Sequence, residues 1–335
     1  MDASRLGKPG GQGRVGAFVR SRVKLSMVLL AAAGTGVLAA GTVGALAADP
    51  ASKRAASEAR LMDSARSIVA AGPAVQGTPA KAQVEALLRS RLEPSDAWVR
   101  RIPFSVELKA IGARWDLVNL VASFHKEAKH RVMIGAHWDI RPWADEDPDP
   151  TKRKLPFDGA NDGASGVAIL LELARALGET PPPEGIGVDL VFFDGEEGPK
   201  GALHENFLGS KELAERWFTT GVTPPYAGII VDMVGRKGTR IRREVASQRR
   251  AGAVQDEIFA VAKAMGSQVF VDEPGIHILD DHTAFLDRGI PVVDLIDIED
   301  PAWHTHADTL DKLDPAVMAE VTDVVLGWIR SQRPR

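Results

Sequence analysis

Three short polar segments of this sequence carry the residue types that bind metal ions through nitrogen and oxygen. They read A-H-W-D at 136–139, G-A-N-D-G-A-S-G at 159–166 and F-F-D-G-E-E at 192–197. The first and the third lie at the ends of apolar runs of strand length, 132–136 and 188–193. Open α/β sheets place their binding sites just past such strand ends. We therefore expect a metal-dependent site where the three segments meet.

Five potential metal ligands come from five separate strand ends or loops. The strand at 132–136 ends in a histidine, the glycine-rich turn holds an aspartate, and carboxylates follow the strands at 188–193 and 228–231. With the histidine of W-H-T, the set is His137, Asp162, Glu197, Asp232 and His304. Two imidazoles and three carboxylates suit zinc.

The adjacent pair Glu196 and Glu197 is the most informative part of the pattern. Neighbouring side chains in an extended segment point in opposite directions. One glutamate can therefore bind the metal while the other faces the substrate as a general base and acid. Taken alone, the pair would be interpreted as two solvated surface carboxylates. Its position after a buried strand, with N-D-G-A-S-G upstream and W-H-T downstream, favours the site.

A second acidic cluster, Asp280-Asp281-His282, precedes a short helix expected at 283–286. Clustered carboxylates either tune one another's pKa values at a site or simply cap the helix. Trp303 is either part of the core or an apolar wall for a small ring. Three other histidines are interpreted as surface or structural residues: His204, His277 and His306.

The elements that must position these residues alternate between strands and helices. Strands are predicted at 98–108, 117–124, 132–136, 188–193, 228–231 and 291–296. Helices are predicted at 56–70, 81–91, 164–177, 251–265 and 315–330. This alternation predicts an α/β fold with a mostly parallel central sheet. Residues 141–158 hold four prolines and five acidic side chains, so they are predicted as a surface loop that either forms a wall of the pocket or is merely solvated.

The N-terminal residues 1–48 differ from the rest of the chain. Residues 1–24 carry six basic side chains against one acidic, and no charged residue occurs in 25–48. This pattern predicts a signal peptide, with a small-residue cleavage sequence at 45–47, or a membrane anchor that is kept. We expect an exported protein of the cell envelope or its surroundings. Residues 49–60 are expected to be a linker and 61–335 the catalytic domain.

The composition excludes some kinds of metal site and argues against one class of partner. The 335 residues are 44% hydrophobic and 26% charged, as in ordinary globular proteins, and none is cysteine. Disulfides and thiolate metal sites are therefore excluded. Residues 49–335 carry 35 basic and 44 acidic side chains, a net charge that argues against nucleic acid as a partner.

Together the motifs resemble the glutaminyl-peptide cyclotransferases of animal and bacterial type, within the zinc aminopeptidase superfamily called peptidase family M28. The motifs that carry this resemblance, beyond the three above, are R-P-W-A-D-x-D-P-D-P at 141–150, L-L-E-L-A-R-A-L at 170–177, D-D-H-T-A-F-L at 280–286 and W-H-T at 303–305. The likeness extends from about residue 56 to the C-terminus. It implies a three-layer sandwich with helices on both faces of a mixed, mostly parallel sheet.

The resemblance also implies a role for each site residue. One zinc ion would be held by Asp162, Glu197 and His304, and Glu196 would be the acid/base catalyst.

Asp232 and Asp280 would form a hydrogen-bonded pair at the substrate, and Trp303 would line the ring pocket. His137 matches a position that, together with Asp232, holds a second metal in aminopeptidases but stays without metal in the cyclases. Unlike the animal enzymes, this chain has neither Trp nor Cys at 198–207.

Three functions are compatible with these residues. The first is conversion of an N-terminal glutamine of a peptide or protein to pyroglutamate with release of ammonia, which needs one zinc. The second is an M28-type aminopeptidase, in which two metals activate a water. The third is a peptide-binding domain without catalysis, which an intact Glu196 argues against.

Overall fold

The computed structural model describes residues 49–199, 201–219 and 223–334, which belong to one compact unit, Ala48–Arg335. The signal peptide or anchor predicted for 1–48 lies outside the described residues. Within the described part of the chain, no helix is both long and apolar enough to cross a membrane.

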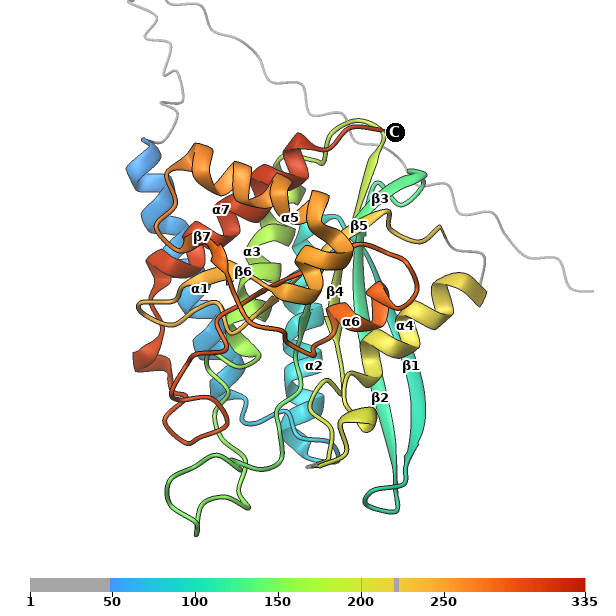
Figure 1. Cartoon of the computed structure of the whole chain (residues 1–335), viewed down its shortest axis with the longest axis vertical. Coiled ribbons are helices and arrows are strands. Elements are labelled where there is room, and N and C mark those ends of the chain that lie inside the picture. Colours follow the sequence, from blue (N-terminus) through green and yellow to red (C-terminus); the bar gives the residue numbers. More distant parts are fainter. Residues whose placement is uncertain (1–48, 200, 220–222, 335) are drawn as a thin grey trace, which may run out of the picture. The chain divides into compact units, whose positions relative to one another are not determined.

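A six-stranded mixed sheet organises this unit (Figure 1). Its strands run in the order β1-β2-β4-β3-β5-β8. The first two neighbouring pairs are antiparallel, and the remaining three pairs are parallel. The bounds are β1 Trp98–Leu108, β2 Ala113–Phe124, β3 His130–His137, β4 Ile186–Phe193, β5 Ala227–Asp232 and β8 Val292–Ile296. A short separate pair is formed by β6 Ile241–Arg243 and β7 Phe270–Pro274.

Helices cover both faces of the sheet, as the resemblance implied. Successive strand residues point to opposite faces, so Ile134 and Ile229 pack into one core while Met133 and Ile230 pack into another. The first core is covered by α1 Pro50–Ala70, α2 Pro79–Leu92, α3 Ala164–Glu179, α5 Val245–Met265 and α7 Pro315–Ser331. The second is covered by α4 Leu208–Thr219 and α6 His282–Leu286. Short 3₁₀ turns lie at Glu93–Ser95, Leu203–Glu205 and Leu310–Lys312.

The prediction of a linker at 49–60 is wrong, because helix α1 already begins at Pro50. Proline suits the first turn of a helix, where its missing N–H has no partner to lose. The Arg54 guanidinium donates to Asp323 and to the Ala316 carbonyl, and Arg60 donates to Glu172. These contacts tie the segment to α7 and α3, so its small polar residues are the exposed face of a packed helix.

Other helix starts also precede their predicted positions. Helix α2 begins at Pro79, again with proline in its first turn. Helix α5 begins at Val245 because the Glu244 carboxylate accepts hydrogen bonds from the N–H groups of Ala246 and Ser247. Glutamate is an unusual cap, which is why the sequence pattern placed this start too late. Helix α4 and the pair β6 and β7 were not predicted.

Asp162 lies just before the first turn of helix α3. Gly166, within that turn, allows the helix to pack directly against the sheet. A Cβ atom at Gly166 would lie 2.3 Å from the Val231 carbonyl oxygen and 3.0 Å from the Ala136 Cβ. We expect Gly166→Ala to lower the free energy of unfolding by about 1–3 kcal/mol. Denaturant unfolding measures this loss. Gly252→Ala in α5 is the control, because its new Cβ meets only the flexible Gln248 side chain at 3.1 Å. Equal stability of the two variants would contradict the close packing.

Candidate metal centre and active site

The carboxyl ends of the four parallel strands meet at one edge of the sheet, and the predicted metal ligands gather there. His137 ends β3, Asp162 precedes α3, and Asp232 ends β5. Glu197 follows β4, and His304 lies in the loop after β8. All five are buried.

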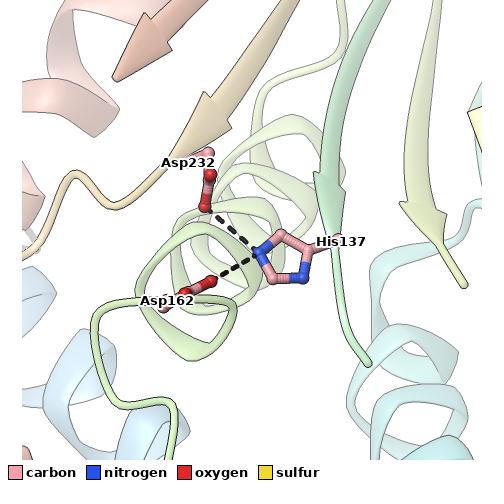
Figure 2. Close-up of side chains that lie close together, drawn as sticks. All are labelled: His137, Asp162 and Asp232. Atoms are coloured by element: carbon pink, nitrogen blue, oxygen red, sulfur yellow. Dashed lines mark hydrogen bonds and ion pairs between the residues drawn. The ribbon is translucent and has the colours of Figure 1, made fainter. Parts of the chain in front are cut away.

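The first of two ligand groups joins His137, Asp162 and Asp232. Figure 2 shows both carboxylates pointing at the same imidazole nitrogen. His137 Nε2 lies 3.2 Å from Asp162 Oδ1 and 3.2 Å from Asp232 Oδ1. The other ring nitrogen, Nδ1, lies 3.1 Å from the Asp139 carbonyl oxygen, which fixes the ring orientation.

The second ligand group joins Asp162, Glu197 and His304. His304 Nε2 lies 3.2 Å from Glu197 Oε1 and 3.5 Å from Asp162 Oδ2. Asp162 therefore belongs to both groups, with one carboxylate oxygen directed to each. Within each group the ligand atoms lie within 4.8 Å of one another. The structure brings together the three residues predicted for the zinc site and the two that would complete a second site.

The donor set and its spacing fit zinc. With bonds of about 2.0–2.2 Å, the ligands of a tetrahedral zinc lie roughly 3.3–3.6 Å apart. The separations of 3.2 and 3.5 Å in the second group agree with this spacing. Asp162 Oδ2 is buried and has no hydrogen-bond partner in the described chain. A buried carboxylate oxygen without a partner is costly, and a bound cation would satisfy it.

Electrostatics at the second group point to the same conclusion. Burial and the charge of Glu197 raise the pKa of the Asp162 carboxyl. Burial alone would raise the pKa of Glu197, but His304 and Arg141 lower it to about 2. Burial would lower the pKa of His304, but Glu197 and Asp145 raise it to about 10. The carboxylates thus attract positive charge into the space that the three ligand atoms surround.

An arginine that sequence reasoning left without a role links two of the predicted ligands. Arg141 Nη1 donates to Glu197 Oε2 at 2.8 Å, and Arg141 Nε donates to Asp145 Oδ1 at 2.9 Å. Asp145 Oδ1 also lies 3.3 Å from His304 Nδ1. Arg141 and Asp145 therefore fix the orientation of Glu197 and His304 from outside the metal position.

We expect Arg141→Met to weaken zinc binding by about 10–100-fold, the usual cost of losing a partner that orients a metal ligand. Competition with a chelator of known zinc affinity measures the change. Arg114→Met is the matched control, since Arg114 lies exposed in β2 and its ion pairs within the described part of the chain are with exposed carboxylates. Unchanged zinc affinity in Arg141→Met would mean that Glu197 and His304 hold their orientation without it.

Asp139 positions the glutamate pair. Its two carboxylate oxygens accept hydrogen bonds of 3.2 Å from the backbone N–H groups of Glu196 and Glu197. Asp139 belongs to the A-H-W-D motif, yet nothing in the sequence indicated its two partners, which lie 57 and 58 residues further along the chain.

Glu196 lines the same pocket as Glu197 but belongs to neither ligand group among the described residues. Its side chain is half-buried. Burial and the neighbouring charge of Glu197 raise the pKa of Glu196 well above its ordinary value. A carboxyl group in this place can hold a proton near neutral pH and exchange it with a bound substrate.

The pocket that holds these residues has a volume of about 180 Å³. Asp232 and Asp280 both line it, and burial with the Asp232 charge raises the pKa of Asp280 to about 6. Asp281 is buried and does not line this pocket, so Asp280 is the member of the pair that faces the site. Trp303 also lines it, 36% exposed, and stacks on the His304 ring with centroids 4.0 Å apart.

The proline-rich loop at 141–158 forms part of the pocket wall, through Arg141, Asp145 and Glu146. His204 and His277 are exposed, which fits their interpretation as surface residues. His306 has a structural contact, with Nδ1 2.9 Å from Asp147 Oδ2.

A buried polar cluster next to the pocket was missed from the sequence. His282 lies fully buried, 3.4 Å from Asp294 and 3.5 Å from Glu244. Asp280, His282 and Asp294 also bring ligand atoms within 4.8 Å of one another. The only sequence signal was D-D-H, since Asp294 lies in an apolar strand and Glu244 precedes a helix.

Backbone strain gathers at this site. Phe207, Met233 and His304 have positive φ angles of 58°, 50° and 54°, and all three line the pocket. Non-glycine residues seldom adopt this conformation, and such residues cluster where structure serves function.

Residues 119–329 match peptidase family M28, and the chain belongs to this family. Its fold is shared by the glutaminyl cyclase of Bacteroides thetaiotaomicron bound to N-acetylhistamine, at 31% identity and a TM-score of 0.78, over 82% of this chain and 98% of that one. It is also shared by a Zn-dependent exopeptidase from Parabacteroides distasonis, at 32% identity and a TM-score of 0.77, over 82% of this chain and 98% of that one.

Among curated proteins, the glutaminyl-peptide cyclotransferase of Gloydius blomhoffii is 25% identical over 237 residues. The match covers 62% of this chain and 63% of that protein, so the chain spans less than two thirds of this relative's length. The family and the fold predicted from the motifs are confirmed.

Proposed function

We propose that this chain is a zinc-dependent glutaminyl-peptide cyclotransferase, which converts an N-terminal glutamine to pyroglutamate and releases ammonia. The observation that carries the proposal is the convergence of Asp162, Glu197 and His304 on one point, with Glu196 beside them in the same pocket. The similarity to proteins named glutaminyl cyclases supports it.

In the proposed reaction the α-amine nitrogen of the substrate attacks the carbon of its own side-chain carboxamide. A new C–N bond closes the five-membered ring, the bond to the amide nitrogen breaks, and that nitrogen leaves as ammonia. Zinc bound by Asp162, Glu197 and His304 would polarise the carboxamide carbonyl. Ring closure within one residue already supplies proximity, so charge stabilisation and proton transfer remain for the enzyme.

Glu196 carries the proton in this proposal. Its carboxylate accepts a proton from the attacking amine and, as the carboxyl group, passes it to the departing nitrogen. The raised pKa of Glu196 suits both roles, because a catalyst that gives and takes a proton works best with a pKa near the working pH.

Asp232 and Asp280 would hold the substrate's amine. The two carboxyl groups lie at the same pocket, and the raised pKa of Asp280 allows the pair to share a proton rather than repel. Trp303 would form the flat apolar side of the ring-binding space.

The aminopeptidase function remains the second candidate because of one observation. The group of His137, Asp162 and Asp232 could hold a second cation beside the first, as dinuclear hydrolases do. We propose one zinc ion, at Asp162, Glu197 and His304.

One assay separates the two functions. Purified residues 49–335 are incubated with a peptide that begins with glutamine and, separately, with a leucine arylamide, and ammonia and arylamine are measured. The proposal expects ammonia alone and close to one zinc per chain. Arylamine together with close to two zinc ions per chain would favour the aminopeptidase instead. If neither ammonia nor arylamine forms, the result would favour a peptide-binding domain without catalysis.

A further inference from the structure

A second pocket adjoins the proposed active site. It has a volume of about 260 Å³ and lies where the end of β7, the segment after it and the end of β8 meet. Ile278, Ile296 and Ile298 line both this pocket and the active-site pocket. The two pockets are therefore neighbours that share an apolar wall.

Apolar and charged side chains both line the second pocket, and the apolar ones include four isoleucines. Besides the three shared isoleucines, Pro274 and Ile276 line it. Ile276 is 56% exposed, and Leu279, at the edge of the active-site pocket, is 51% exposed. Large apolar side chains left exposed beside a polar site indicate a surface that binds a ligand.

The charged residues of the second pocket are already paired. Arg242 forms an ion pair with Glu299, and Asp297 accepts a hydrogen bond of 2.9 Å from the Arg240 backbone N–H. Acidic side chains are at least as numerous as arginines along this lining. An apolar occupant fits this pocket, whereas an acidic one would meet repulsion.

The wall that carries Ile276 is held in place by its backbone. The Val245 N–H donates to the Ile276 carbonyl at 3.2 Å, and the Ile278 N–H donates to Glu244 Oε1 at 3.0 Å. The pocket is thus formed before a ligand arrives, and binding does not have to order this segment.

We propose that the second pocket is a specificity subsite, which takes a bulky apolar side chain from one of the first residues after the N-terminal glutamine of the substrate. This inference rests on the proposed function. With the glutamine in the active-site pocket, the rest of the peptide must leave through its opening. An extended peptide advances by about 3.3 Å per residue, so a residue shortly after the glutamine reaches the neighbouring pocket across the shared isoleucines.

The test compares substrates that differ only after the glutamine. Gln-Ala-Ala-Ala amide is the reference, and leucine or aspartate replaces each alanine in turn. At one position we expect leucine to lower KM about tenfold and aspartate to raise it, with kcat little changed, because an apolar pocket discriminates side chains by roughly this factor.

The variant Ile276→Asp should abolish the leucine advantage, so that the leucine peptide and the reference peptide have the same KM. Ile111→Asp is the control, since Ile111 is 43% exposed in the turn between β1 and β2, away from both pockets. Thermal unfolding of both variants should match that of the unchanged protein.

The outcomes separate the two proposals. Turnover of the reference peptide with equal KM for all substrates, or a leucine advantage that survives Ile276→Asp, would overturn the subsite alone. No turnover of any glutamine peptide would overturn the proposed function and the subsite with it.

Discussion

Glu196→Gln should lower kcat by about 10²–10⁴-fold while the protein still binds zinc. Glutamine keeps the size of the side chain but can neither accept nor release the proton that moves between the amine and the leaving ammonia. Because Glu196 belongs to neither ligand group, the metal content should stay close to that of the unchanged protein. Turnover of a glutamine peptide and zinc per chain, measured on one preparation, test both statements.

The control for this variant is Glu146→Gln, which changes another carboxylate that lines the same pocket but is exposed. It should keep kcat within a few-fold. Loss of zinc in Glu196→Gln would mean that the two adjacent glutamates have exchanged roles, and full activity would remove Glu196 from the mechanism.

His304→Ala should abolish both turnover and stoichiometric zinc binding. The imidazole supplies the one nitrogen ligand of the proposed site, and its removal leaves only the carboxylates of Glu197 and Asp162 to bind the ion there. We expect the zinc affinity to fall by more than about 100-fold, beyond the loss caused by removing a partner outside the metal position.

A readout independent of activity is the effect of zinc on thermal unfolding. A ligand at 100 times its Kd stabilises the folded state by about 2.7 kcal/mol, so added zinc should raise the Tm of the unchanged protein but not that of His304→Ala. His277→Ala, an exposed histidine, should respond to zinc like the unchanged protein. A zinc-dependent rise of Tm in His304→Ala would contradict the ligand assignment.

The sequence was sufficient to predict which candidate ligands lie close together because of how parallel sheets are built. Predominantly apolar runs marked the buried strands β3, β4, β5 and β8, and the carboxyl ends of parallel strands lie along one edge. Polar residues that follow such runs, including His137 and Asp232, therefore had to meet. The roles of single residues, such as Glu196 as the acid/base, came from the family resemblance and stay predictions.

Residues that act through long-range contacts could not be predicted. Arg141 and Glu197 are 56 positions apart, and Glu244 caps α5 while His282 begins α6, so no local pattern links either pair. The start of α1 was misjudged for a related reason. Its small polar residues suit a linker as well as an exposed helix face, and only contacts such as that of Arg54 with Asp323 decide between them.

The most direct test of the central claim is anomalous diffraction at the zinc absorption edge from crystals of the zinc-loaded protein. One peak bound by Asp162, Glu197 and His304, with the Glu196 carboxylate outside the coordination shell, is the predicted result. A zinc ion bound by Glu196, a peak away from these three side chains, or two peaks bridged by Asp162 would contradict it.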